Sequence, residues 1–149
     1  MVIYEGIFFE GENVDIIRSL EKEKLDKIVD NLHCTFKYKP DTEEIFNDIV
    51  GQTFEVYLVG YGCDRKNSGF SIVLPDVLKD YYINHDENTG ELKVAHITTS
   101  LSNDGKAVDT KNLSFNLLDK PIKIIGRFGY FLDNKTVSYE PFILSKELN

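Results

Sequence analysis

The sequence predicts a single α+β domain that is rich in β-structure. Its 149 residues fit the usual size of one domain, and a hydrophobic content of 42% is enough for one well-developed core. Short runs of β-branched and aromatic residues recur between turn-forming stretches, whereas only one long segment has helical spacing. We therefore expect residues 1–149 to form one unit without linkers.

The first third of the chain predicts a strand, a helix and a second strand. Residues 3–9 are mainly aromatic and β-branched, as in a strand. Over residues 13–32 apolar side chains recur on one helical face and charged side chains cover the other, with Asn13 as the expected N-cap. Residues 32–39 predict a strand that ends before Pro40.

The remainder of the chain predicts strands separated by short helical turns. Helical turns are expected over residues 42–49 and 75–82, where a capping residue or a proline begins the segment. An Asp-Gly pair at residues 104–105 is a strong turn signal. The expected strands are residues 53–59, 70–74, 92–101, 122–132 and 136–144.

The acidic charge of the chain argues against one class of partner. A net charge of −8 and a pI near 4.9 do not suit a protein that grips long nucleic acid through its phosphates, so a small or short nucleotide fits better. Residues 1–6 show neither a basic region nor a long apolar run, so we expect no secretory signal, no membrane partner and a cytoplasmic protein. Cys34 and Cys63 are expected to be buried thiols.

The most informative feature is a short pattern that occurs twice. It reads His-Cys-Thr-Phe at residues 33–36 and His-Ile-Thr-Thr at residues 96–99. Each copy lies in a predicted strand, where side chains two residues apart point to the same face of the sheet. Two such strands side by side would form a pocket of two imidazoles and two hydroxyls.

These residues suit acid–base chemistry on a phosphate, and the candidate catalytic residues are His33, Thr35, His96 and Thr98. One imidazole would take a proton from water or a ribose hydroxyl, and the other would protonate the leaving oxygen. The two threonines would donate to non-bridging phosphate oxygens. The sequence does not indicate which histidine is the acid. The third histidine, His85, lies in a polar stretch and is interpreted as a solvated residue.

Candidate substrate contacts come from nearby basic and aromatic residues. Lys37 continues the strand face of the first motif, and Arg127 is a second candidate for a phosphate contact. Tyr4 and Tyr130 are candidates for stacking on a base, although core packing is the commoner role for any one aromatic residue.

The two tetrads resemble the signature of the 2H phosphoesterase superfamily, in which His, a hydrophobic residue, Ser or Thr and another hydrophobic residue occur twice. The first copy matches fully, and the second departs only at Thr99. The resemblance implies a bilobed fold, with two antiparallel-sheet lobes around a central cleft and flanking helices. It also implies phosphodiesterase activity without metal or other cofactor on 2′,3′-cyclic phosphates, 2′-5′ linkages, RNA ends or cyclic oligonucleotides.

Three other interpretations of the motif residues stay open. A zinc site would recruit Cys34 and Cys63, but Cys34 should face away from His33, and no Cys-x-x-Cys or His-x-x-x-His pair occurs. A non-catalytic module on the same fold would bind a nucleotide without cleaving it, and it would not need two proton-transfer groups. The tetrads would otherwise be ordinary core strands.

Overall fold

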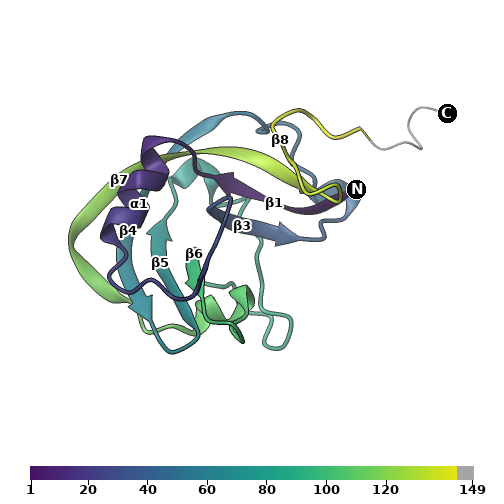
Figure 1. The fold of residues 1–149 in the computed structure, drawn as a ribbon. Helices are drawn as coiled ribbons and strands as arrows, with labels where there is room; N and C mark the ends of the chain where they lie inside the picture. The colour runs from purple at the N-terminus through teal and green to yellow at the C-terminus, as the bar shows by residue number, and fades with distance from the viewer. Residues whose placement is uncertain (144–149) are drawn as a thin grey trace.

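A curved antiparallel sheet dominates the computed structural model, which describes residues 1–143 (Figure 1). Within residues 1–143, one short α-helix and three 3₁₀ turns accompany the sheet, which confirms the predicted sheet-rich α+β class. Within the described part of the chain, no helix has the length and apolar character needed to cross a membrane.

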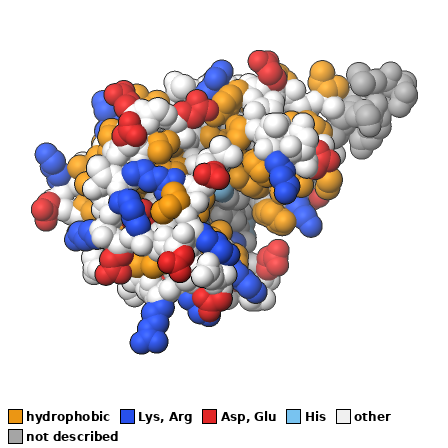
Figure 2. All heavy atoms as spheres, in the orientation of Figure 1, with side chains coloured by type: hydrophobic (Ala, Val, Ile, Leu, Met, Phe, Trp, Pro, Cys, Tyr) orange, Lys and Arg blue, Asp and Glu red, His pale blue; other side chains and the backbone are white. Residues whose placement is uncertain are grey.

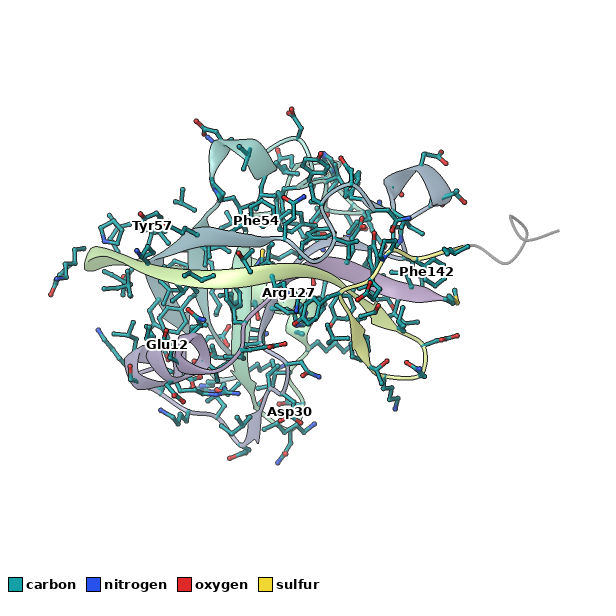
Figure 3. The ribbon with its side chains drawn as sticks, turned by 90° about the horizontal axis from the view of Figure 1, so that it is seen from above. Glu12, Asp30, Phe54, Tyr57, Arg127 and Phe142 are labelled. Carbon is teal, nitrogen blue, oxygen red and sulfur yellow. The ribbon has the colours of Figure 1, made fainter. Side chains whose placement is uncertain are left out.

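The elements follow one another in a simple order. The helix is α1 (Glu12–Leu20), and the 3₁₀ turns are η1 (Thr42–Glu44), η2 (Asp76–Leu78) and η3 (Ala107–Asn112). The strands are β1 (Val2–Phe8), β2 (Lys27–Ile28), β3 (His33–Tyr38), β4 (Thr53–Cys63), β5 (Asn67–Val73), β6 (His96–Leu101), β7 (Asn116–Leu132) and β8 (Val137–Ser138). Seen from above, β7 runs across most of the molecule (Figure 3).

The sheet consists of two similar halves that β4 and β7 join. The strand order is β2-β6-β5-β4-β7-β1-β3, with β8 on β7, and all pairs are antiparallel. In one half β1 lies between β3 and β7, and in the other β5 lies between β6 and β4. The curvature brings Cα atoms of β3 and β6 within 8 Å of one another, although these strands lie far apart in the strand order. The two motif strands therefore face each other across the open side of the sheet.

Each motif strand is opposed by a glycine at the same place. Gly6 of β1 pairs with Thr35, and Gly69 of β5 pairs with Thr98, with a register shift immediately before each glycine. A Cβ at Gly6 would lie 2.1 Å from a carbonyl oxygen of β3, and one at Gly69 would lie 2.4 Å from a carbonyl oxygen of β6. Only glycine fits such close approaches, and a bulge bends the strand that carries it. In both halves, therefore, a glycine and a bulge bend the sheet beside the motif.

The alternation predicted for the motif strands is confirmed. Cys34 and Phe36 of β3 are buried, as is Ile97 of β6, and they join the core beneath the sheet. The histidine and threonine of each motif are half-buried on the opposite face. The core that fixes both strands contains several large apolar side chains, among them Phe36, Leu58, Phe70, Ile97, Ile124 and Phe128.

The predicted helix over residues 13–32 is wrong in its second half. The helix ends at Leu20, and the chain then continues through bends without regular secondary structure until residues 27–28 pair with β6. Long-range contacts outweigh the helical pattern, because Arg18 donates to the backbone oxygens of Val29 and Thr99. Asn13 is not the N-cap, which is Gly11, and the Asn13 amide oxygen accepts from a backbone N–H of β7 instead.

Several other predicted boundaries shift. The helical turns expected over 42–49 and 75–82 shorten to η1 and η2. The strand expected over 92–101 begins at His96, and the one expected over 122–132 begins earlier, at Asn116. Of the strand expected over 136–144, only β8 forms, and residue 144 lies outside the described residues.

Candidate active site

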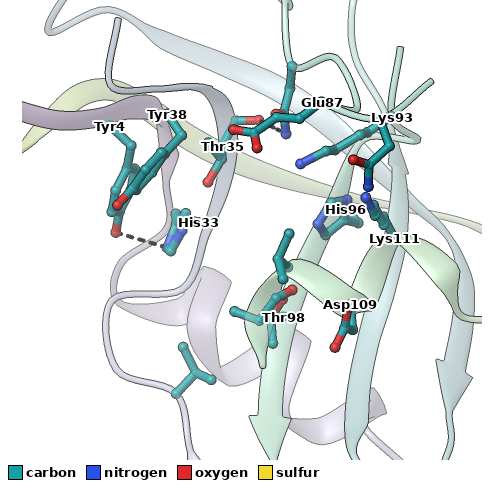
Figure 4. Close-up of a pocket in the computed structure, with 15 residues that line it drawn as sticks. Tyr4, His33, Thr35, Tyr38, Glu87, Lys93, His96, Thr98, Asp109 and Lys111 are labelled. Atoms are coloured by element: carbon teal, nitrogen blue, oxygen red, sulfur yellow. Dashed lines mark hydrogen bonds between the residues drawn. The ribbon is translucent and has the colours of Figure 1, made fainter. Parts of the chain in front are cut away.

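A cleft of about 600 Å³ lies between β3 and β6. Its lining includes the four predicted catalytic residues His33, Thr35, His96 and Thr98. Figure 2 shows this face of the molecule hollowed, with pale-blue histidine surface visible inside the hollow. The close-up in Figure 4 shows the two histidines on opposite walls. The structure thus brings together residues that are 63 positions apart in the sequence.

Both histidines are oriented by the same local contact. His33 Nδ1 lies 2.8 Å from the carbonyl oxygen of Asn31, and His96 Nδ1 lies 2.6 Å from that of Val94. Since a carbonyl only accepts, each Nδ1 carries the proton and donates it, which leaves Nε2 for chemistry. His85 makes the same kind of contact at 3.0 Å but does not line the cleft. Position in the cleft therefore distinguishes the motif histidines.

The wall around His33 is aromatic. The ring of Tyr4 stacks on the imidazole with centroids 4.5 Å apart, and the ring of Phe8 lies 5.5 Å away. Tyr4 Oη also lies 3.4 Å from His33 Nδ1. Burial lowers the pKa of His33 to about 4, because a charged imidazole is poorly solvated there; the nearby His96 adds to this effect. His33 is therefore held in its neutral form at neutral pH.

The wall around His96 carries two lysines. Lys93 and Lys111 line the cleft on this side (Figure 4). Burial lowers the pKa of His96, and the charges of both lysines lower it further. Lys111 forms an ion pair with Asp86, and both side chains are largely shielded from solvent.

The two threonines are held differently. Thr98 Oγ1 donates to Thr110 Oγ1 at 2.8 Å, and Thr110 also accepts from the side-chain amide of Asn67 at 3.0 Å. Thr110 and Asn67 are buried, so Thr98 belongs to a fixed polar network. Thr35 Oγ1 makes no hydrogen bond with residues 1–143 and points into the cleft (Figure 4). Its hydroxyl is available to a ligand.

The departure of Thr99 from the hydrophobic tetrad pattern has a structural reason. Glu21, at the end of α1, is 4% exposed, and its Oε2 accepts hydroxyl hydrogen bonds from Ser68 (2.9 Å), Thr99 (2.6 Å) and Ser100 (2.7 Å). A buried carboxylate needs such donors. Thr99 thus fastens the back of β6 to the end of the helix while Thr98 faces the cleft.

Of the predicted substrate contacts, only Tyr4 lines the cleft. Its ring lies between those of His33 and Phe131, with the second pair of centroids 4.9 Å apart, so it offers no free face for a base. Tyr38, the register partner of Tyr4, lines the same wall and is 54% exposed. Tyr38 is therefore the aromatic residue best placed to meet a ligand.

The other predicted contacts lie outside the cleft. Lys37 shares a strand face with His33, but its amine lies 3.9 Å from a carboxylate oxygen of Glu44. Tyr130 is fully buried among core side chains and donates to the Asn47 side chain at 2.7 Å. The structure therefore does not bring Lys37 and Tyr130 together with the other predicted site residues.

Arg127, labelled in Figure 3, is also not among the residues that line the cleft. Its Nε donates to the carbonyl oxygen of Gly51 at 2.9 Å, and its guanidinium lies 4.3 Å from the ring centroid of Tyr139. These contacts hold the residue that follows β8 and the residues that precede β4 against β7. Arg127 has a structural role here, which its place in a predicted strand did not reveal.

Sequence reasoning missed the two lysines of the cleft. Lys93 lies three residues before His96, so its proximity to the motif was a usable signal. Lys111 lies in η3, which only the tertiary fold brings to this wall, so no local pattern predicted it. Among residues 1–143, no three His, Cys, Asp or Glu side chains gather as a metal-binding group.

Neither a protein-family model nor a curated protein matches the chain. The geometry of the cleft is therefore the basis for assigning a function.

Proposed function

We propose that the protein is a phosphodiesterase that acts on a small or short nucleotide by two-histidine acid–base catalysis without a metal ion. The proposal follows the resemblance of the two tetrads to the 2H phosphoesterase superfamily. In this proposal the two halves of the sheet correspond to the two lobes of that fold, with the cleft between β3 and β6 as the central cleft. The similar glycine and bulge beside each motif support this correspondence.

The proposal depends mainly on one observation. Two imidazoles line the same cleft, and each is oriented by the same kind of backbone contact. Both rings donate from Nδ1 to a backbone oxygen, so both direct the basic Nε2 position to chemistry. The backbone contact also stabilises the ring when it becomes charged, because an imidazolium donates more strongly than a neutral imidazole. Two core histidines without a function would have no reason to share a cleft with two hydroxyls.

The reaction requires two coupled proton transfers. As an oxygen of water or of a ribose hydroxyl bonds to phosphorus, the neutral histidine takes the proton of that oxygen. As the bond from phosphorus to the leaving oxygen breaks, the protonated histidine gives its proton to that oxygen. Thr35 donates to one non-bridging oxygen, and Thr98 donates to another once its single hydroxyl hydrogen turns from Thr110 to the phosphate, where negative charge increases. Each proton transfer contributes roughly 10²- to 10⁴-fold to the rate.

A substrate panel in EDTA tests the proposal. The purified protein is incubated with nucleoside 2′,3′-cyclic phosphates, 2′-5′ and 3′-5′ dinucleotides and cyclic oligonucleotides, and products are read by mass spectrometry. We expect hydrolysis of at least one class in EDTA, and a loss of roughly 10²- to 10⁴-fold in His33→Ala and His96→Ala.

His85→Ala is the matched control, because His85 makes the same backbone contact outside the cleft. It should retain wild-type turnover. Unchanged turnover in His33→Ala and His96→Ala would contradict the proposal. Binding of a nucleotide without turnover by the wild type would favour the non-catalytic module, and activity that EDTA abolishes would favour a metal enzyme.

A further inference from the structure

Two amines lie inside the cleft on the side of His96. Lys93 and Lys111 are both half-buried there, and each is close enough to the other for its charge to be felt. Such a pair of like charges costs free energy unless an anion lies near it. The fold nevertheless holds both amines at the same wall.

The carboxylates nearby leave one of these amines unpaired. Lys111 forms its ion pair with Asp86, whereas the Lys93 amine makes no ion pair or hydrogen bond with residues 1–143. Glu87 and Asp109 also line the cleft, but both are exposed at its rim. Asp86 is shielded from solvent together with Lys111 and balances its charge, whereas Glu87 and Asp109 are exposed. The half-buried Lys93 amine is left without an ion-pair partner among residues 1–143, so its surroundings favour an anion.

Both lysine amines lie on the His96 side of the cleft. Their charges act on His96, whereas the charge that acts on His33 is that of His96 itself. Figure 4 shows the same arrangement, with both lysines beside His96 and the two tyrosines beside His33. A phosphate held between the two imidazoles would therefore leave the Lys93 amine free for another group.

We propose that Lys93, supported by Lys111, binds a second phosphate next to the scissile one, so that the preferred substrate is a nucleotide with at least two phosphates. This inference rests on the proposed function, since it takes the site between the histidines as the place of cleavage. The cleft volume of about 600 Å³ accommodates more than a single phosphate and sugar. A nucleoside cyclic phosphate without a further phosphate would leave Lys93 without a partner.

Calorimetric binding of unreactive nucleotides tests the inference independently of catalysis. The probes are adenosine 3′,5′-bisphosphate, adenosine 3′-monophosphate and adenosine 5′-monophosphate, each titrated into the full chain. We expect the bisphosphate to bind the wild type about tenfold or more tightly than either monophosphate, as one charge-assisted contact provides. Lys93→Met should remove that difference and leave monophosphate affinity nearly unchanged.

Two further variants serve as controls. Lys123→Met removes an exposed lysine of β7, paired with Glu55 and distant from the cleft lining, and should keep the preference for the bisphosphate. Lys93→Arg keeps the charge and should keep most of the preference, which separates loss of charge from misfolding.

The outcomes separate this inference from the proposed function. Equal affinity for all three probes, an absence of binding, or an equal loss for all probes in Lys93→Met would overturn the second phosphate site. Hydrolysis in the EDTA panel together with any of these results would leave the phosphodiesterase proposal intact. A preference for the bisphosphate that depends on Lys93, without hydrolysis of any panel member, would support the anion site and overturn the enzyme.

Discussion

The two halves of the cleft carry the same motif in different surroundings. Both histidines donate from Nδ1 to a backbone oxygen, and both motif threonines face a glycine that follows a register shift. His33, however, is packed against aromatic rings, whereas His96 lies beside two lysines. The backbone thus presents the two imidazoles alike, and the neighbouring side chains give them different proton affinities.

This difference leads us to expect different roles for the two histidines. An imidazole held neutral among rings suits the base, which must be unprotonated before reaction. The imidazole beside the two lysines gains a phosphate anion as a neighbour when substrate binds, and that anion raises its pKa and favours the protonated acid.

The leaving group of the substrate distinguishes the base from the acid. With a nucleotide substrate, His33→Ala and His96→Ala should each lose roughly 10²- to 10⁴-fold in kcat. With a 4-nitrophenyl phosphodiester, whose leaving oxygen needs no proton, His96→Ala should recover most of its loss while His33→Ala should not. The measurement is steady-state kinetics with both substrates, and recovery in His33→Ala instead would reverse the assignment.

Removal of either threonine hydroxyl should lower the rate by a similar factor, but only removal of the Thr98 hydroxyl should lower the stability of the fold. Thr35→Val and Thr98→Val should each lower kcat by about 10²-fold, because each removes one donor to the phosphate. Thr98→Val should also lower the free energy of unfolding by about 1 kcal/mol, since the buried Thr110 hydroxyl loses a partner, whereas Thr35→Val should not. Kinetics and urea denaturation check both effects, with Thr35→Ser and Thr98→Ser as hydroxyl-retaining controls. Equal stability of the two valine variants would contradict the difference between the walls.

The pH dependence of kcat/KM should be bell-shaped with its optimum on the acid side of pH 6.5. The base must be neutral, so the rate falls as pH drops below its pKa, which is about 4 for His33. The acid must be protonated, so the rate falls as pH rises above the pKa of His96, which is lowered from its usual value. Tyr4→Ala should shift the low-pH side of the profile to higher pH, because removal of the ring exposes His33 to water and so raises its pKa. A flat profile, or an optimum above pH 7, would contradict this description.

Loss of the buried charge behind β6 should destabilise the fold. Glu21→Gln weakens the hydrogen bonds that three hydroxyls donate to one oxygen, and it should cost about 1–3 kcal/mol of unfolding free energy. Glu43→Gln, at an exposed position of η1, is the control and should change stability little. Urea denaturation measures both variants. An equal effect of the two substitutions would show that Glu21 does not fasten β6 to α1.

Local sequence patterns correctly predicted which side chains of each motif strand lie on the cleft face and which lie in the core. The alternation of residues 33–36 and 96–99 places the histidines and threonines on one face and the core residues on the other, as the strand period requires. The end of α1 at Leu20 could not be predicted in this way, because it depends on a carboxylate buried against strands about 50 and 80 residues away. The position of Lys111 in the cleft and that of Lys37 outside it likewise depend on tertiary contacts.

The central claim is that both imidazoles meet one phosphate, and nitrogen-15 NMR of the histidine rings tests it most directly. In the free protein, the rings of His33 and His96 should be neutral near pH 7 and protonated on Nδ1. Titration with inorganic phosphate should shift the Nε2 resonances of both rings with a single dissociation constant and leave those of His85 unchanged. A response of only one motif histidine, or of neither, would contradict the account.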